Sequence, residues 1–381
     1  MRLTRKFWFL KRDMNNPDGE SKKEGKMKSV RLFQLFLAVV FSFLLVANTG
    51  SVDAAPPAKP IILKASIWTA APSANVFSRA YIWILPEIEK RSEGRLKIEY
   101  YYSGSLVPAK ETVSGLKSGV ADIAFVNPGY EPGKIPLSTV TTLPAISHDS
   151  YSSNMAFAEL LRMPELKAEL DQNNIMYLGP VCAISYGFWT KRPVRSIADL
   201  KGKKIMATGE HSLLMKAFGA VPVSIVSTEA YPAMEKGIVD GGLANPGYAN
   251  DYKWQEICPY YYELLLGSKT HFMGINKDSW AKLPADIQQM FVNLIEEACK
   301  KGHEIYQGNA ESKLKEFVAK GIVTVTKPLA ADVALLEKTS HDLISVKWVK
   351  KMEEKGLAGQ KVLDNWVNVY KKYDALNPFK K

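Results

Sequence analysis

Two patterns of apolar positions alternate along the first part of the chain. Ile61 to Trp68 is β-prone and mostly apolar, and Leu96 to Tyr102 alternates, so each stretch predicts a strand. Between them, apolar residues at helical spacing predict a helix that follows the polar turn ending at Asn75 and runs to about Arg91. Pro86 falls inside this helix and is expected to kink it.

Longer elements are expected further along. Leu137 to Ile146 predicts an irregular apolar crossover, and a helix capped within Ser147 to Ser150 is expected to reach about Leu170. Ile175 to Trp189 and Tyr260 to Asn276 predict two long strands that cross between halves of the molecule. The chain then predicts a long amphipathic helix from Pro284 to about Val318 and further helices over residues 329–373.

One 20-residue pattern occurs twice, at residues 111–130 and 229–248, without a gap. Each copy predicts a short helix closed by glycine, a strand and an Asn-Pro-Gly-Tyr turn, so two similar α/β lobes are expected. Ligands of open α/β sheets bind beyond the carboxyl ends of strands, where the turns of Asn127 and Asn245 would lie. The alternative is that ordinary helix–strand units agree through turn chemistry, because Asn-Pro-Gly is a common turn sequence.

The pattern at the N-terminus differs from the rest. Residues 1–26 are polar and of mixed charge, whereas Met27 begins a basic region, an apolar run from Leu32 to Ala47 and a small-residue site before Ala55. This order predicts a cleavable secretory signal peptide, so residues 1–54 are expected to be a leader. An uncleaved anchor is the alternative, although the run is shorter than the roughly 20 residues of a bilayer span.

Charge and composition narrow the possible functions. The chain of 381 residues carries a net charge of +11, but residues 1–54 hold ten basic and five acidic residues, which leaves about +6 elsewhere. The remaining lysines are scattered, so we expect no nucleic-acid partner. Cys182, Cys258 and Cys299 lack metal-site spacing, and one bridge among them stays open. We expect no cofactor and no metal.

No motif of a catalytic site is found in the sequence. His303-Glu-Ile-Tyr-Gln307 has glutamine where a zinc-binding helix needs its second histidine, and the glycine-rich phosphate-binding and nucleophile-elbow patterns are absent. His271 could face a cleft, although a structural histidine is the commoner case. These observations favour a binding protein over an enzyme.

The chain resembles the DctP-type substrate-binding proteins of TRAP (tripartite ATP-independent periplasmic) transporters. In the first lobe the resemblance rests on Arg91-Ser-Glu-Gly-Arg-Leu-Lys-Ile, Gly104-Ser-Leu, Gly119-Val-Ala-Asp and Leu143-Pro-Ala. The second lobe and the long helix contribute Lys191-Arg-Pro-Val, Asp199-Leu-Lys-Gly-Lys-Lys-Ile, Gly219-Ala-Val-Pro-Val, Glu229-Ala-Tyr, Val239-Asp-Gly and Trp280-Ala-Lys-Leu-Pro-Ala-Asp-Ile-Gln. These segments follow the order of the family and cover residues 61–375.

The resemblance implies a two-lobed α/β periplasmic-binding-protein fold of type II, with crossing strands and long C-terminal helices that pack across both lobes. Lobe 1 is expected over residues 61–180 and 262–303, and lobe 2 with the C-terminal helices over 181–261 and 304–381. It also implies a periplasmic receptor that closes on a small organic ligand, an organic acid in this family, and delivers it to membrane permease subunits. We expect a monomer.

The same resemblance implies a ligand site between the lobes. The residues matched to it are Trp68, Asn127, Tyr130, Tyr186, Trp189, Met206, Gly209, Ser227 and Asn245. The family usually grips an organic acid through arginine, yet Met206 and Trp189 stand at two positions where arginine is common. Arginine suits carboxylates because its planar fork makes two charge-assisted hydrogen bonds, whereas methionine and tryptophan suit an apolar or aromatic ligand.

Other interpretations stay open. Met206 and Trp189 could be core residues, with Lys110, Arg192 or His211 supplying the charge that a buried carboxylate needs. The protein could present its ligand to a receptor rather than to a permease. An enzyme on a two-lobed fold is the third reading, since fold does not imply function.

Overall fold

A computed structural model of the protein describes residues 59–181 and 184–380. The predicted leader, residues 1–54, and Cys182 lie outside the described residues. Cys258 and Cys299 are both buried. Within the described part of the chain, no helix is long and apolar enough to cross a membrane.

The first of two sheets has five strands. Their order is β2 (Leu96–Tyr101), β1 (Ile61–Ser66), β3 (Ile123–Val126), β10 (His271–Asn276) and β4 (Ile175–Val181). β1 runs parallel to β2 and β3, whereas β10 runs antiparallel to β3 and β4. The early strands therefore form one side of this sheet, and a strand from far along the chain completes it.

The second sheet has six strands and a related arrangement. Their order is β11 (Thr324–Thr326), β9 (Tyr260–Tyr262), β5 (Gly187–Thr190), β8 (Gly241–Ala244), β6 (Lys204–Met206) and β7 (Val221–Val223). β8 has parallel β6 on one side and antiparallel β5 on the other, as β3 has β1 and β10. The expected α/β fold with two related lobes is confirmed.

The two copies of the repeated pattern occupy equivalent places. The helices α4 (Thr112–Lys117) and α8 (Ala230–Glu235) precede β3 and β8. The repeated aspartates have one role: Asp122 accepts a hydrogen bond from the backbone N–H of Lys64, and Asp240 accepts one from Lys204, both at 2.8 Å. Each aspartate therefore fastens the start of its own strand to the neighbouring parallel strand.

Helices cover the sheets. Early in the chain these are α2 (Val76–Tyr81), α3 (Ile84–Arg91), α5 (Ser150–Leu160), α6 (Pro164–Gln172), α7 (Glu210–Ala217), α9 (Pro246–Asp251) and α10 (Lys277–Ala281). They are followed by α11 (Ala285–Ala319), α12 (Ala330–Thr339), α13 (Val346–Glu353) and α14 (Gly359–Ala375).

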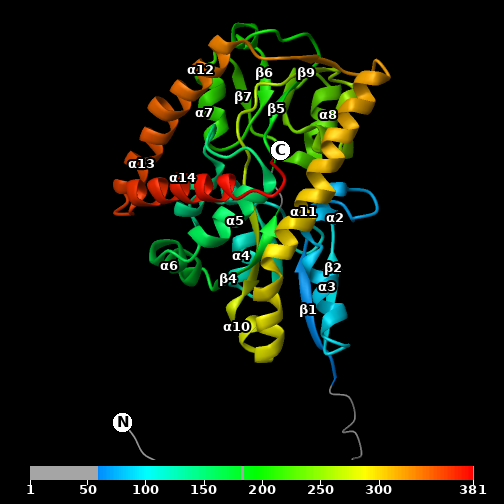
Figure 1. The fold of residues 1–381 in the computed structure, drawn as a ribbon, viewed down its shortest axis with the longest axis vertical. Helices are drawn as coiled ribbons and strands as arrows, with labels where there is room; N and C mark the ends of the chain where they lie inside the picture. Colours follow the sequence, from blue (N-terminus) through cyan, green and yellow to red (C-terminus); the bar gives the residue numbers. More distant parts are fainter. Residues whose placement is uncertain (1–58, 182–183, 381) are drawn as a thin grey trace, which may run out of the picture. The chain divides into compact units, whose positions relative to one another are not determined.

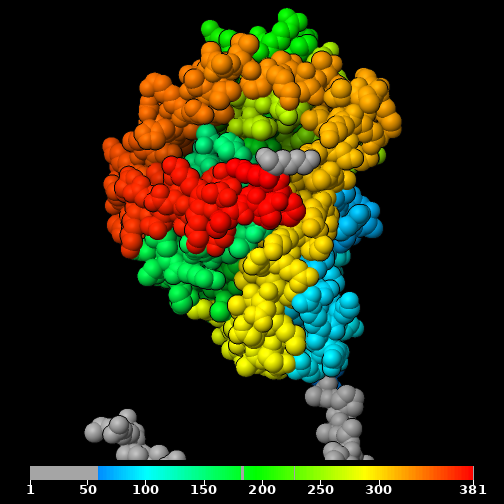
Figure 2. Space-filling view, in the orientation of Figure 1, coloured from blue at the N-terminus to red at the C-terminus, as the bar shows by residue number. Residues whose placement is uncertain are grey.

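The long helix α11 is confirmed and connects the two halves of the described chain. It packs against α2, α3, α5 and β4 beside the first sheet and against α9 beside the second (Figure 1). The C-terminal helix α14 packs on α5, where its red surface lies against the green of that segment (Figure 2). Trp348 of α13 and Trp366 of α14 are buried in the same core as Phe157 of α5.

Four predicted elements differ from the structure. The helix expected to be kinked at Pro86 breaks earlier, at Ile82 and Trp83, and Pro86 lies in the first turn of α3, where its missing N–H costs no hydrogen bond. The helix expected over residues 150–170 is divided before Pro164, which starts α6. Each of the two long strands expected to cross between the halves is instead two shorter strands in different sheets: β4 and β5 in one case, β9 and β10 in the other.

The division into lobes remains a prediction, but two structural details bear on its boundaries. Tyr262 was expected in lobe 1, yet it ends β9 of the second sheet. The expected boundary between residues 303 and 304 falls inside the continuous helix α11. Because α11 is continuous and packs on elements of both sheets, the helix itself marks no boundary between the lobes at this point.

Candidate functional site

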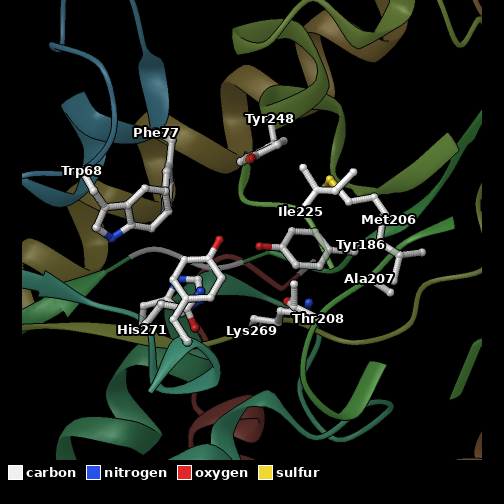
Figure 3. Close-up of a pocket in the computed structure, with 13 residues that line it drawn as sticks. Trp68, Phe77, Tyr186, Met206, Ala207, Thr208, Ile225, Tyr248, Lys269 and His271 are labelled. Atoms are coloured by element: carbon white, nitrogen blue, oxygen red, sulfur yellow. The ribbon is translucent and has the colours of Figure 1, made fainter. Parts of the chain in front are cut away.

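A small cavity lies between elements of the two sheets. Its volume is about 50 Å³. The lining residues are Trp68, Phe77, Asn127, Tyr130, Tyr186, Met206, Ala207, Thr208, Ile225, Leu243, Tyr248, Lys269 and His271. Figure 3 shows Trp68 and Phe77 on one side, and Tyr186, Met206, Ala207 and Ile225 on the other.

The walls come from the carboxyl ends of equivalent strands. Trp68 follows β1, and Asn127 follows β3 directly. In the second sheet, Met206 ends β6 and Leu243 lies in β8 near its end. This is the place where open α/β sheets bind ligands, because the loops beyond parallel strands converge there.

Stacked aromatic rings form the wall contributed by the first sheet. The ring of Trp68 stacks on Phe125 with centroids 4.5 Å apart and planes at 16°. The ring of Tyr130 also contacts Trp68, with centroids 5.7 Å apart and planes at 56°. Trp68 is 5% exposed and its Nε1 has no hydrogen-bond partner in the structure. An unpaired buried donor is costly, so this N–H is available to a polar group that enters the cavity.

A positively charged side chain also lines the cavity: Lys269, from the segment between β9 and β10. Its ammonium is 5.5 Å from the centroid of the Tyr186 ring. Burial lowers the pKa of Lys269 to about 8. Two buried histidines lie close enough to interact with it electrostatically: the pKa of His211 is well below its ordinary value, and that of His271 falls to about 3, in both cases mainly through burial.

Five of the nine residues predicted for the site line this cavity: Trp68, Asn127, Tyr130, Tyr186 and Met206. They come from both sheets, so the structure brings together parts of the chain that are far apart in sequence. Met206 is 7% exposed, lines the cavity, and also belongs to the same apolar cluster as Trp189.

Of the other four predicted residues, Trp189, Gly209 and Asn245 lie elsewhere. Trp189 is fully buried in β5, where its ring packs on Tyr261 at 4.8 Å and its Nε1 donates to the carbonyl of Ala244. Gly209 lines a separate surface groove beside Trp348 and precedes α7 with φ of 58°. Ser227 lies in a short turn, and nothing of its side chain is described. Asn245 is buried at the start of α9.

The two repeated asparagines have structural partners. The Asn127 side chain accepts a hydrogen bond from the backbone N–H of Gly129 at 3.0 Å, and Asn245 accepts one from Tyr248 at 2.9 Å. Asn245 also donates to the hydroxyl of Tyr306 in α11 at 3.0 Å. Of the two, only Asn127 lines the cavity. Both amides were expected to face one ligand; in the structure Asn127 lies at the cavity, whereas both polar atoms of the buried Asn245 amide have protein partners.

The cation at the cavity is one that sequence reasoning missed. Lys110 and Arg192 are exposed and do not line the cavity, and His211 is fully buried. Lys269 lies in an irregular segment, where no periodicity identifies the face of each residue. The signal that could have found it is a single lysine between the apolar run ending at Leu266 and the buried strand β10. Phe77, Ala207, Thr208, Ile225, Leu243 and Tyr248 also went unpredicted, whereas His271, for which a place at the cleft was one of two interpretations, lines the cavity.

No cluster of three or more metal-ligating side chains is found among residues 59–181 and 184–380. The described residues that line the cavity offer the ammonium of Lys269, the imidazole of His271, the amide of Asn127, the hydroxyl of Thr208 and several aromatic rings.

A hydrogen-bonded contact joins the two sides next to the cavity. Asp251, at the end of α9, accepts hydrogen bonds from the backbone N–H groups of Val76 and Phe77, at 3.2 and 3.1 Å. These N–H groups begin α2, and Phe77 lines the cavity. A carboxylate at a helix N-terminus satisfies free donors and complements the helix dipole. Asp251 therefore stabilises the approach of α9 to α2.

We expect Asp251→Ala to weaken this contact by about 1 kcal/mol, the typical worth of a helix cap. The α2 N–H groups would then be better satisfied by water, so the ligand-free protein should shift towards a more open arrangement. Small-angle scattering should report a larger radius of gyration. Asp364→Ala is the matched control, because Asp364 accepts from Gln360 on its own helix. Identical scattering curves for Asp251→Ala and the control would show that the contact does not hold the halves together.

The chain matches the family model described as bacterial extracellular solute-binding protein, family 7, over residues 73–345. A solute-binding protein of Albidiferax ferrireducens is 27% identical over 209 residues, which are 50% of this chain and 60% of that relative. The match thus spans less than two thirds of that relative.

Solved structures show the same fold. A TRAP periplasmic solute-binding protein from Desulfovibrio salexigens is 27% identical with a TM-score of 0.72, covering 83% of this chain and 97% of that one. A TRAP solute-binding protein from Rhodoferax ferrireducens, solved in complex with copurified benzoate, is 22% identical with a TM-score of 0.75. That likeness covers 83% of this chain and 99% of the other.

Proposed function

Because the chain belongs to family 7 of the bacterial extracellular solute-binding proteins, we propose that it is the solute receptor of a TRAP-type transporter for a small organic acid with an aromatic or apolar body. The proteins of this family that it resembles are binding proteins. The receptor would be exported to the periplasm, would bind as a monomer without a cofactor or catalysis, and would hand its ligand to the membrane permease subunits.

One observation carries the ligand class: aromatic side chains and Met206 form much of the cavity wall, and among the described residues no arginine lines it. Aromatic walls favour a flat apolar body through burial and ring stacking. A second carboxylate would lack a cationic partner here, and burying an unpaired charge is costly. Benzoate bound to the R. ferrireducens protein of the same fold agrees with this class.

The cavity is too small to hold an aromatic acid, so binding requires the protein to change its conformation. A dry cavity that holds benzene has a volume of roughly 150 Å³, and this cavity has about 50 Å³. An aromatic acid therefore requires the lining to move apart before it binds. Hinges that absorb such movements are usually a few residues at element ends. The crossings between β4 and β5 and between β9 and β10 are the segments in which this chain passes from one sheet to the other.

The test is a ligand screen on protein purified from the periplasm after expression of the full chain. We expect benzoate, phenylacetate and indole-3-acetate to raise the melting temperature by several degrees at saturating concentration, because a ligand at 100 times its Kd stabilises by about 2.7 kcal/mol. Succinate, malate and sialic acid are expected to have little effect.

Calorimetric titration of each positive compound then gives its Kd. Native mass spectrometry of the untreated protein would identify any acid that co-purifies. A large shift with succinate or malate, and none with the aromatic acids, would contradict the proposed ligand class. No binding of any acid would contradict the receptor function itself.

A further inference from the structure

Lys269 is a positively charged residue that has no ion-pair partner among the described residues. Its side chain lines the cavity, and no carboxylate of the described residues forms an ion pair with it. The one contact of its ammonium that the structure defines is the face of the Tyr186 ring, 5.5 Å from the centroid. By contrast, the neighbouring surface lysine Lys277 is paired with Asp171 at 2.5 Å. Lys269 is thus a lysine that lines the cavity, is not fully exposed, and has no carboxylate partner among the described residues.

The groups that surround Lys269 do not supply a negative charge. His211 of α7 and His271 of β10 are both at least 96% buried, and neither ring nitrogen of either residue has a hydrogen-bond partner. The tyrosines that line the same cavity are Tyr130, Tyr186 and Tyr248. An ammonium among neutral groups in a partly desolvated site strongly favours the arrival of an anion, because the alternative is an uncompensated charge.

We propose that Lys269 binds the carboxylate of the ligand, in the role for which arginine is expected at other positions, and that the ligand carries one carboxylate. This assignment rests on the proposed function and specifies how the site recognises its substrate. One ammonium offers three donors and neutralises one charge, whereas an arginine fork would hold a carboxylate in two parallel bonds.

The geometry orients the ligand as well. Lys269, Thr208 and Tyr186 group away from Trp68 and Phe77 in Figure 3. A carboxylate at Lys269 therefore directs the apolar body of the acid towards the stack of Trp68 on Phe125. The free Nε1 of Trp68 then becomes a second recognition element for a hydroxyl or other acceptor on the ring.

Binding should also depend on pH in a defined direction. The pKa of free Lys269 is about 8, and a bound carboxylate raises it. Below pH 8 the ammonium is charged in both states and the affinity is constant. Above pH 8 the free protein loses the proton that binding requires, so the affinity falls by up to tenfold per pH unit. Burial lowers the pKa of His211 and His271 and raises that of Tyr186, so these three stay neutral from pH 7 to 10.

The test measures benzoate, phenylacetate and indole-3-acetate binding by calorimetry between pH 7 and 10. We expect Lys269→Gln to weaken binding by about 100-fold at pH 7 and to abolish the loss of affinity above pH 8. Lys110→Gln and Arg192→Gln are matched controls that remove an exposed positive charge and should change the affinity less than threefold. The neutral amide benzamide should bind wild type and Lys269→Gln equally.

The fold of the variant can be checked independently. Lys269→Gln removes an unpaired charge from a partly desolvated site, so its ligand-free melting temperature should equal or exceed that of wild type. A folded Lys269→Gln protein that keeps wild-type affinity or wild-type pH dependence would overturn the role of Lys269 while leaving the receptor function intact. If wild type binds none of the three acids, the assignment and the proposed ligand class both fall.

Discussion

Trp189→Ala is expected to lower the free energy of unfolding by about 3 to 5 kcal/mol, the usual cost of truncating a buried tryptophan. The side chain is fully buried, packs on Tyr261, and donates its N–H to the carbonyl of Ala244 at 3.2 Å. The truncation leaves a cavity and an unpaired carbonyl in the second sheet. Chemical denaturation monitored by circular dichroism measures the loss.

A matched pair of milder variants separates the roles of two tryptophans. Trp189→Phe should reduce stability, because it removes a donor that has a partner, and should leave benzoate affinity unchanged. Trp68→Phe removes a donor without a partner, so its stability should change less, while its affinity for aromatic acids should fall. If Trp189→Phe weakens binding and Trp68→Phe does not, the two residues have been assigned the wrong way round.

Gly241→Ala is expected to cost roughly 3 kcal/mol of stability, towards the upper end for overpacking. A Cβ at this position would lie 2.2 Å from the carbonyl oxygen of Trp189 and 3.0 Å from the Cα of Thr190. Gly241 pairs with Thr190 across β5 and with Ile205 across β6, so neither neighbour can withdraw without loss of the sheet register. The melting temperature should fall by several degrees.

Gly308→Ala is the control for this substitution. Gly308 lies inside α11, and an added Cβ would meet nothing within 4 Å. Alanine is favoured over glycine in a helix interior by up to about 1 kcal/mol, so this variant should be slightly more stable than wild type. Equal melting temperatures for Gly241→Ala and wild type would contradict the pairing of β8 with β5.

The repeated pattern illustrates how sequence can predict a fold better than a site. Its identical residues gave the two equivalent helix–strand units, and the structure explains the identities by backbone contacts: Asp122 and Asp240 each hold the start of a neighbouring strand. Asn127 and Asn245 cap the turns that follow. The residues are repeated because the backbone of each unit uses the same hydrogen bonds. Of these four residues, only Asn127 also lines the cavity.

Trp189 shows why side-chain direction could not be predicted. All four residues of β5 are buried. In a strand buried on both faces, apolar residues point in both directions, so alternation carries no information about which face meets the ligand. Met206 and Trp189 were equivalent candidates on sequence grounds and belong to one apolar cluster, yet of the two only Met206 also lines the cavity.

The sequence by itself determined the class of fold, the repeated unit and the long helix α11, because hydrophobic periodicity and glycine at helix ends are local properties. It also determined the family, through segments distributed along the whole chain. The tertiary structure alone decided the charge of the site. Lys269 reaches the cavity through an irregular segment between two sheets, and its lowered pKa arises from burial there. Such an environment depends on contacts between distant segments, which no local pattern encodes.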